Sequence, residues 1–436
     1  MPFLTGLQSE TLRNKLKMKR RCVITGIGVV SPNGIGTEAF SDGVLEGRSG
    51  VRRISRFDSS AIEVQIAGEV SGFDELAWVE KKERKHVSRV LPLALCASAE
   101  ALHSAGIDTA SLPLEQRRRF GVIMGTGGGS QEFTEEQYRL YFHGQLSKMS
   151  LFCIPTGVMG SLSSELNVRF ALKGPSHIVT TGCTSSTDAM AYSMRQIESG
   201  RLDCVLTGGA DAPISLGTVR GFILMKILTE KWNTAPEKGS RPFSADRDGF
   251  VLAEGSWMFV FEEYEHAKAR GAKILAEVAG YGSTCEAYHR VRLMECGEEP
   301  ARAISLAIKN AGISVEDVDY VNLHGTSTQL NDRIETRALK MALGDERARQ
   351  VPMSALKSQI GHPQGACGAA GVAATLIAMQ HGQLPPTINL ENADKECDLD
   401  YVPQPGRKKT IEHAVCNCIA FGSKNSALVL RNVAQG

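Results

Sequence analysis

The chain contains an internal duplication, and no other feature constrains its fold as strongly. The stretch "ALHSAGIDTASLPLEQRRRFGVIMGTGGGS", which begins at Ala101, is matched by "AIKNAGISVEDVDYVNLHGTSTQ", which begins at Ala307. In each copy a helix-like segment ends on Ala-Gly-Ile, a polar loop follows, and a β-branched run leads into a turn of small and hydroxyl residues. Two copies of one α/β unit predict an internally duplicated fold and not a solenoid, which needs three or more short repeats.

Two further matches extend the copies. "RCVITGIGVVSPNG" resembles "ILAEVAGYGSTCEAYH" at residues 274 to 289, and the helical run after Cys183 resembles "GAAGVAATLIAMQHGQ". Strand-like and helix-like segments alternate throughout, which implies α/β layers around buried sheets. We expect an N-terminal extension over residues 1–18 and two halves over 19–271 and 272–436, with Gly271 as the C′ residue of the linking helix.

Charge and composition exclude several kinds of partner. The 49 basic and 48 acidic residues are interspersed and give a net charge of +1, so neither nucleic acid nor an anionic membrane is an expected partner. No segment approaches the roughly 20 apolar residues of a membrane span. The N-terminal residues lack the apolar region of a secretory signal. Either Met18 is the native start, or the preceding residues form a short transit-like or regulatory extension.

The cysteines and the glycine-rich turns exclude other sites. Eleven cysteines occur without a C-x-x-C pair, so no metal site is expected, and a reducing compartment, the cytoplasm or an organelle, fits best. "TGIGVV" has Gly26 and Gly28 but neither the third glycine nor the distant acid of a dinucleotide site. "GTGGGS" at residues 125 to 130 lacks the lysine of a P-loop, so we interpret it as a tight turn or a close backbone approach.

A cysteine lies at one predicted corner between a strand and a helix. In "HIVTTGCTSSTDAMAYSMRQIESG", residues 177 to 200, Cys183 follows an apolar run, and Thr184 or Ser185 is placed to cap the following helix. The positive end of the helix dipole lowers the pKa of a thiol there and favours the nucleophilic thiolate. The alternative is a buried structural cysteine, as most free cysteines are.

Two histidines and a lysine follow other predicted strands. "DYVNLHGTSTQLND" places His324 just beyond a strand, and "SALKSQIGHPQGACGAAG" places Lys357 and His362 beyond another. Catalytic groups of α/β sheets gather outside the carboxyl ends of the strands. We therefore expect these side chains to converge with Cys183, with small flanking residues leaving room for a substrate.

Five ordered motifs carry a family resemblance from about residue 19 to the C-terminus. "TTGCTSS", "NLHGTST", "LKSQIGH", "RPFSADRDGFVLAEG" and "AFGSKNSALVL" resemble the β-ketoacyl-[acyl-carrier-protein] synthases, above all the type II elongating condensing enzymes. The resemblance implies the thiolase fold, with two pseudo-equivalent halves in five αβαβα layers, usually as a homodimer. It also implies decarboxylative Claisen condensation of an acyl thioester with malonyl-[acyl-carrier-protein] to give 3-oxoacyl-[acyl-carrier-protein], in fatty acid or related elongation.

The resemblance assigns a role to each candidate residue. Cys183 matches the nucleophile that takes the acyl chain, His324 and His362 match the pair that drives decarboxylation, and Lys357 matches the lysine beside them. Neutral imidazole N–H groups suffice to stabilise the enolate, so we expect both histidines to act as donors. The remaining matches are Phe421, a gating aromatic whose backbone N–H completes the oxyanion hole, and Thr326 and Thr328, which hold the phosphopantetheine arm of acyl carrier protein. The reaction so assigned needs no metal or diffusible cofactor.

The chain departs from the family pattern at several positions. Gln329 replaces a usual proline, Gly371 a glutamate and Val291 a threonine, and the usual "FGFGGTN" reads "AFGSKN", with Ser423. These changes suggest an altered preference for acyl chain or carrier protein. A ketosynthase of a specialised polyketide or unusual-lipid pathway, or a catalytically silent chain-length-factor-like subunit, therefore stays an alternative to a fatty acid enzyme. A degradative thiolase, with Cys416 or Cys418 as its second cysteine, fits the two histidines less well.

Overall fold

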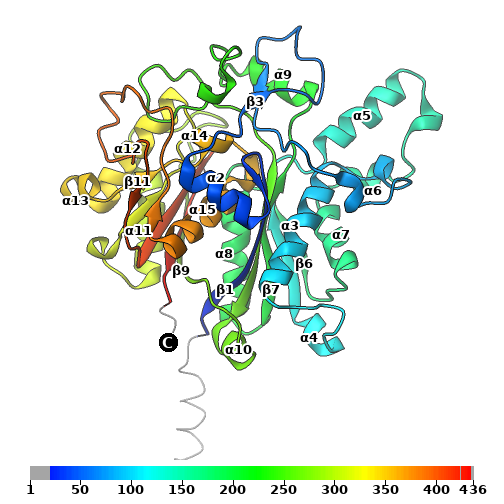
Figure 1. Ribbon diagram of the computed structural model, residues 1–436, viewed down its shortest axis with the longest axis horizontal. Helices are drawn as coiled ribbons and strands as arrows, with labels where there is room; N and C mark the ends of the chain where they lie inside the picture. The colour runs from blue at the N-terminus through cyan, green and yellow to red at the C-terminus, as the bar shows by residue number, and fades with distance from the viewer. Residues whose placement is uncertain (1–19, 423, 434–436) are drawn as a thin grey trace, which may run out of the picture.

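The computed structural model describes residues 20–422 and 424–433. The expected extension over residues 1–18 and the departure at Ser423 lie outside these residues. The strands form one mixed sheet in the order β11-β10-β14-β15-β9-β1-β8-β7-β5-β6, with the short β2 paired to β1 (Figure 1). Each side of the β9-β1 junction holds five of the ordered strands, which is the duplication expected from the repeats.

The strand directions repeat as well as the strand order. On one side the chain supplies β1 (Cys22–Ser31), β8 (Gly255–Glu263), β7 (Cys204–Asp211), β5 (Phe120–Gly125) and β6 (Ser176–Val179). On the other side it supplies β9 (Ala276–Cys285), β15 (Lys424–Arg431), β14 (His413–Ala420), β10 (Tyr320–Asn322) and β11 (Met353–Ser354). In both sets the first three strands pair antiparallel and the last three pair parallel.

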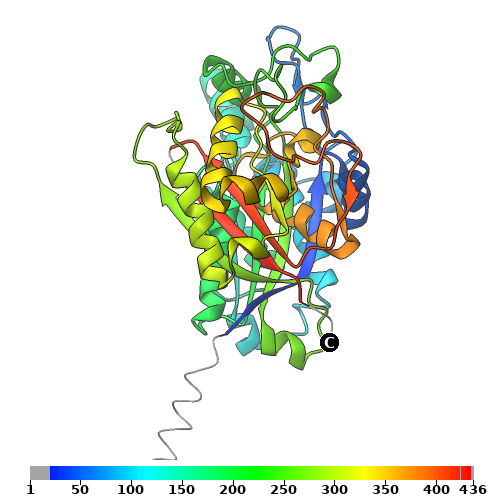
Figure 2. The ribbon, with the colours of Figure 1, turned by 90° about the vertical axis from the view of Figure 1, so that its left-hand side faces the viewer.

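Helices complete a five-layered arrangement. α8 (Ser185–Glu198) and α15 (Cys367–His381) lie between the two sets of strands and share one apolar core with their inner faces. α3 (Val90–Ser104) and α7 (Ser161–Arg169) cover the outer face of the first set, while α11 (Glu298–Ala311) and α12 (Gln329–Leu343) cover that of the second (Figures 1 and 2). α15 is apolar on every side, as a central helix must be. The predicted α/β thiolase fold is confirmed.

The "TGIGVV" glycines serve helix packing. A Cβ atom on Gly28 in β1 would lie 2.0 Å from the carbonyl oxygen of Ala97 in α3. A Cβ atom on Gly282 in β9 would lie 2.1 Å from the carbonyl oxygen of Ala303 in α11. The two halves therefore use glycine at the same place and for the same purpose, which is the close approach of a helix backbone to a strand.

The remaining elements connect and flank the layers. α10 (Tyr264–Ala269) links the two sets of strands, and Gly271 follows it with φ 67°, at its predicted C′ position. The other helices are α2 (Thr37–Glu46), α4 (Leu114–Arg118), α5 (Gln131–Phe142), α6 (Cys153–Gly157), α9 (Leu216–Leu224), α13 (Asp345–Gln350) and α14 (Lys357–Ile360). The other strands are β2 (Gly34–Ile35), β3 (Arg52–Arg53), β4 (Ile66–Ala67), β12 (Gln383–Leu384) and β13 (Arg407–Lys408). The division of the chain between residues 271 and 272 stays a prediction.

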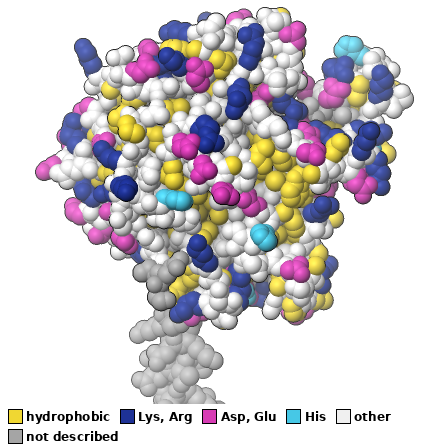
Figure 3. Space-filling view, in the orientation of Figure 1, with side chains coloured by type: hydrophobic (Ala, Val, Ile, Leu, Met, Phe, Trp, Pro, Cys, Tyr) yellow, Lys and Arg dark blue, Asp and Glu magenta, His cyan; other side chains and the backbone are white. Residues whose placement is uncertain are grey.

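The surface fits the balanced charge of the sequence. Figure 3 shows basic and acidic side chains mixed over the visible face, with apolar patches between them. In the described part of the chain, no helix is both long enough and apolar enough to cross a membrane.

Candidate active site

Cys183 lies in the corner between β6 and α8. Gly182 precedes it with φ 76°, a left-handed conformation that suits glycine, and Thr184 occupies the N-cap position of α8. The expected side-chain cap is absent, because the Thr184 hydroxyl donates to the carbonyl of Thr181 and the Ser185 hydroxyl to that of Gly182. These bonds tighten the corner and turn the Cys183 side chain toward the second half of the chain.

The expected lowering of the Cys183 pKa is wrong. The side chain is 7% exposed, and burial raises the pKa of its thiol above the ordinary value, with the nearby Cys367 adding to the effect. The charge of Lys357 and the backbone N–H of Phe421, which points at the sulfur, oppose the rise without overcoming it. Desolvation of the thiolate outweighs the helix dipole here, so Cys183 rests as a thiol.

His324 and His362 meet at the Cys183 sulfur, as expected. Cys183 Sγ lies 3.4 Å from His362 Nε2, and the two imidazole rings stand nearly perpendicular with centroids 5.5 Å apart. Both rings are almost fully buried. Burial and the charge of Lys357 lower the pKa of each histidine well below its ordinary value, so both are neutral.

The partners of the two rings assign the tautomers. His362 Nδ1 accepts the backbone N–H of Gln364 at 3.0 Å, and His324 Nδ1 lies 3.3 Å from Lys357 Nζ, which can only donate. Each neutral ring therefore carries its proton on Nε2. Lys357 Nζ also donates to the His324 carbonyl at 2.5 Å, which holds this loop in place. The geometry thus agrees with the expectation of two N–H donors.

A cavity of about 280 Å³ opens onto these groups. It is lined by six of the seven predicted site residues, Cys183, His324, His362, Thr326, Thr328 and Phe421, whereas Lys357 lies behind His324. The Thr326 and Thr328 hydroxyls are 2.9 Å apart on one wall. The rest of the lining is mainly apolar and includes Met225, Ile227, Phe250, Leu293, Leu330 and Ile419. Such a cavity suits an acyl chain attached to a polar arm.

Three buried carboxylates hold the loops of this site, and the sequence analysis missed them. Glu335 accepts the backbone N–H groups of His324 and Gly325 at 2.7 Å each, and Asp332, one turn earlier on α12, accepts that of Thr326 at 3.1 Å. Their spacing of three residues places both on one face of the helix that follows "HGTST", which was the available signal.

Asp211 is the third carboxylate, at the end of β7. It accepts the hydroxyl of Thr126 and the backbone N–H groups of Gly127, Gly128 and Gly365. The "GTGGGS" turn therefore wraps a carboxylate of the protein itself and binds it to the loop that follows His362. The predicted close approach is also confirmed, because a Cβ atom on Gly125 would lie 2.3 Å from the backbone nitrogen of Ser186.

The departures from the family pattern lie around the site. A Cβ atom on Gly371 would lie 2.6 Å from Asn322 Oδ1, and the Asn322 amide nitrogen is buried without a hydrogen-bond partner. Val291 lines the cavity, and Gln329 begins α12 directly after Thr328. The electrostatic surroundings of the histidine loops therefore differ from the pattern that the resemblance implied.

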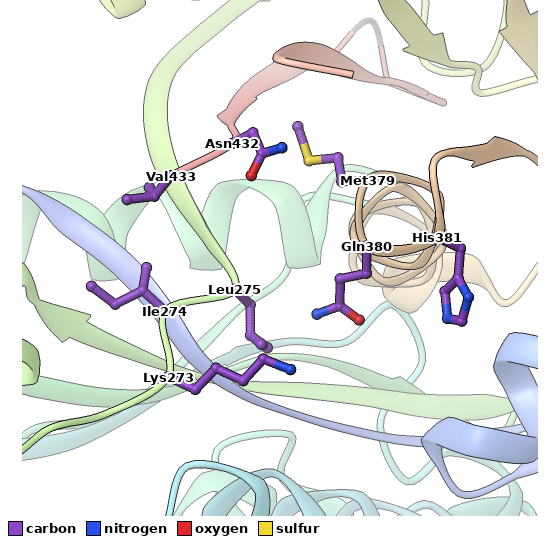
Figure 4. A pocket seen from close by; sticks show the side chains of 8 residues that line it. All are labelled: Lys273, Ile274, Leu275, Met379, Gln380, His381, Asn432 and Val433. Atoms are coloured by element: carbon purple, nitrogen blue, oxygen red, sulfur yellow. The ribbon is translucent and has the colours of Figure 1, made fainter. Parts of the chain in front are cut away.

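A larger cavity of about 510 Å³ lies elsewhere and offers no comparable chemistry. It is lined by Lys273, Ile274, Leu275, Met379, Gln380, His381, Asn432 and Val433 (Figure 4). His381 Nε2 is 3.3 Å from the Ser41 hydroxyl, and the lining holds neither a thiol nor a carboxylate. The smaller cavity at Cys183 is therefore the candidate site.

Comparisons with known proteins identify the family of the chain. Residues 19–267 match the family model of the β-ketoacyl synthase N-terminal domain, and residues 275–391 match that of the C-terminal domain. A 3-oxoacyl-[acyl-carrier-protein] synthase 2 of Synechocystis sp. is 38% identical over 413 residues, which cover 95% of this chain and 98% of the relative. A putative polyketide β-ketoacyl synthase 1 of Streptomyces halstedii is 41% identical over 419 residues, with the same two coverages.

Two solved structures are similar over nearly the whole chain. A ketosynthase of a type II polyketide synthase, in complex with its acyl-carrier protein and bound to the hexaketide, has a TM-score of 0.87 at 31% identity and covers 95% of this chain. The ishigamide ketosynthase/chain length factor has a TM-score of 0.87 at 32% identity and covers 96%. Both solved chains are covered completely. The chain therefore belongs to the β-ketoacyl synthase family, the condensing acyltransferases of fatty acid and polyketide elongation.

Proposed function

We propose that this protein condenses an acyl thioester held on Cys183 with malonyl-[acyl-carrier-protein], releasing carbon dioxide and 3-oxoacyl-[acyl-carrier-protein]. The observation that carries the proposal is the distance of 3.4 Å between Cys183 Sγ and His362 Nε2, with a second neutral histidine across the same cavity. A thiol beside two N–H donors suits a reaction that needs a nucleophile and a stabilised enolate. The proposal requires neither a metal nor a diffusible cofactor.

In the first step Cys183 takes the acyl chain. Its sulfur attacks the thioester carbonyl of the acyl carrier, a new carbon–sulfur bond forms, and the bond to the carrier arm breaks. The proton of the Cys183 thiol ends on the departing pantetheine thiol. Negative charge on the carbonyl oxygen is stabilised by the backbone N–H groups of Cys183 and Phe421, and the latter already points at the sulfur.

In the second step the histidines act on the malonyl group. The Nε2–H groups of His324 and His362 donate to the malonyl thioester carbonyl while the bond to the carboxylate breaks and carbon dioxide leaves. The resulting enolate forms a carbon–carbon bond to the acyl group, and Cys183 leaves as thiolate, which takes up a proton from water to restore the resting thiol. Two neutral donors are stronger candidates than a charged pair, because burial beside Lys357 disfavours the imidazolium form.

The same geometry suits an acyl carrier protein as the partner. Thr326 and Thr328 offer adjacent hydroxyls on the wall of the cavity, where they would hold the amides of a phosphopantetheine arm. The reaction is common to fatty acid and polyketide elongation, and relatives of both kinds match the chain at similar identity. The free thiols of all eleven cysteines favour a reducing compartment, such as the cytoplasm.

A second copy of the chain is the proposed partner in assembly. β6 is the outermost strand at one end of the described sheet, so its outer edge pairs with no other strand of the described residues. Exposed apolar side chains gather on the neighbouring arm formed by α5 and α6, among them Tyr141, Phe142, Leu151 and Ile154. An open strand edge beside such a surface is typical of a subunit interface.

Light scattering should give twice the mass of one chain. A monomer would contradict the homodimer, and dimers formed only with a second protein would favour a chain-length-factor pairing.

Condensation itself is tested with purified carrier proteins. The protein is mixed with acyl- and malonyl-[acyl-carrier-protein], and 3-oxoacyl product is measured by mass spectrometry. We expect product from the wild type and none from Cys183→Ala, because the acyl chain then has no attachment point. Replacement of the exposed Cys285 by alanine is the matched control and should leave the rate unchanged. Equal product from Cys183→Ala would overturn the proposal, and no product from any acyl donor would favour the silent-subunit alternative.

A further inference from the structure

Two thiols that the condensation does not use lie next to the active site. Cys367 is the first residue of α15, and Cys418 lies in β14; both are buried and neither lines the cavity. Their sulfurs are 3.6 Å apart and lie 3.2 and 3.1 Å from the carbonyl oxygen of Cys183. Cys418 Sγ is also 3.5 Å from His324 Nδ1.

These distances match the edges of a tetrahedral zinc site. Zinc–sulfur and zinc–nitrogen bonds of about 2.3 and 2.0 Å place two sulfurs about 3.8 Å apart and a sulfur and a nitrogen about 3.5 Å apart. Here the sulfurs of Cys367 and Cys418 are 3.6 Å apart, and Cys418 Sγ lies 3.5 Å from His324 Nδ1. The ligand atoms of His324, Cys367 and Cys418 all lie within 4.8 Å of one another. The Cys183 carbonyl oxygen, which contacts both sulfurs, offers a fourth donor.

Charge favours this set over the catalytic one. Two thiolates neutralise a divalent ion, so binding with loss of both thiol protons leaves the net charge of the buried site unchanged beside Lys357. The alternative set of Cys183, His324 and His362 has one thiol and would leave an extra positive charge in the same place. An unbalanced buried charge is costly.

A third group of potential ligands, remote from the active site, is already paired. Glu262 lies with Cys204 and His266, but both of its oxygens accept from the Arg270 guanidinium at 2.7 Å. Thr25 donates to the same carboxylate at 2.8 Å. A cation there would have to displace a buried ion pair, so this group is a poor metal site.

We propose that His324, Cys367 and Cys418, with the carbonyl of Cys183, form a binding site for a thiophilic divalent metal ion such as Zn²⁺. Binding breaks the two S–H bonds, releases both protons to the solvent and forms two metal–sulfur bonds without oxidation or reduction. The ion takes the lone pair of His324 Nδ1 that Lys357 now contacts. Occupancy therefore removes a lysine contact from a catalytic histidine and inhibits condensation. The inhibition rests on the proposed function, whereas the binding does not.

The site escaped the sequence analysis because its ligands come from three separate segments. His324 follows β10, Cys367 begins α15 and Cys418 lies in β14. No pair among them has the short spacing of a zinc motif. The expectation that condensation needs no metal is unaffected, since the ion would occupy an inhibitory place and not a catalytic one.

Binding is tested on the reduced, metal-free protein without any substrate. Zn²⁺ is added in weak buffer, and bound metal and released protons are measured together; Co²⁺ is then used so that thiolate ligation is seen as a charge-transfer absorption. We expect about one bound ion per chain with release of about two protons. Cys367→Ala and Cys418→Ser should each lose this ion, while Cys183→Ser and the matched control Cys416→Ala should keep it.

Two results would overturn the site. One is the absence of bound metal and proton release in the wild type, which does not depend on the folding of any variant. The other is loss of the ion in Cys183→Ser with retention in Cys367→Ala and Cys418→Ser, since this places the metal among the catalytic side chains. Wild-type condensation should fall on addition of Zn²⁺ and return with a chelator. Metal binding without loss of condensation would overturn the inhibitory role alone.

Discussion

The chemistry of His324 and His362 is decided by what lies on the far side of each ring. A backbone N–H fixes Nδ1 of His362, and Lys357 fixes that of His324, so both rings present Nε2–H to the cavity. Burial keeps both rings neutral. Both rings can therefore donate to an enolate oxygen, which is the role proposed for them, without a prior change of protonation.

The buried histidines also predict a loss of stability in acid. Their folded pKa values lie well below the unfolded value of about 6.5, so below that pH the unfolded chain binds protons that the folded chain does not. Each histidine should then cost about 1.4 kcal/mol of unfolding free energy per pH unit, with no effect at higher pH. Urea unfolding at about pH 7.5 and 5.5 measures this loss.

A pair of variants isolates the histidine contribution. His362→Asn should show a smaller loss of stability between the two pH values than the wild type, because one proton-linked group is gone. His103→Asn changes an exposed histidine and should keep the wild-type loss. An unchanged loss in His362→Asn would mean that the folded protein protonates this ring.

Sequence reasoning predicted that Cys183, His324 and His362 lie together, but it misjudged their surroundings. Cys183 and His362 could be selected as candidates because each lies among small residues next to the end of a predicted strand. The direction of the Cys183 pKa shift did not follow, because Cys367, Cys418 and Ala420, which pack around the buried thiol, lie far along the chain. The role of Asp211 could not be predicted for a similar reason, because most of the groups that donate hydrogen bonds to it are backbone N–H groups of distant loops.

At the scale of elements, paired glycines set the distance between helix and strand in both halves. Gly28 and Gly282 each lie where a Cβ atom would meet a helix carbonyl at about 2 Å. The duplication and the alternation of strands and helices could be predicted from the sequence, because they rest on local patterns. The purpose of "TGIGVV" could not be predicted, because the helix residue that each glycine contacts, Ala97 or Ala303, lies more than 20 residues away along the chain.

Substitution of these glycines should therefore destabilise the protein. Gly28→Ala must push α3 from β1, and overpacking of this kind costs about 1 to 3 kcal/mol or more. Gly221→Ala in α9 is the matched control, since a Cβ atom there meets nothing within 4 Å. Removal of a helix-interior glycine should stabilise by about 0.5 to 1 kcal/mol. Denaturant unfolding gives both values, and equal stability of the two variants would contradict the packing argument.

At the scale of the whole molecule, the candidate active site forms where two copies of one fold face each other. Cys183 comes from the corner after β6 in the first half, and His324 and His362 come from loops of the second half. α8 and α15 bring these corners together across the middle layer. The duplication thus places the proposed nucleophile on one side and the two proposed donors on the other.

The acyl-enzyme is the central claim, and intact-mass spectrometry tests it most directly. The protein is mixed with acyl carrier proteins of graded chain length, in the absence of any malonyl donor, and the adduct is located by peptide mapping. The account predicts a single acyl adduct on Cys183, absent from Cys183→Ala, whose yield reports the preferred chain length. No adduct with any chain, or an adduct on another cysteine, would contradict it.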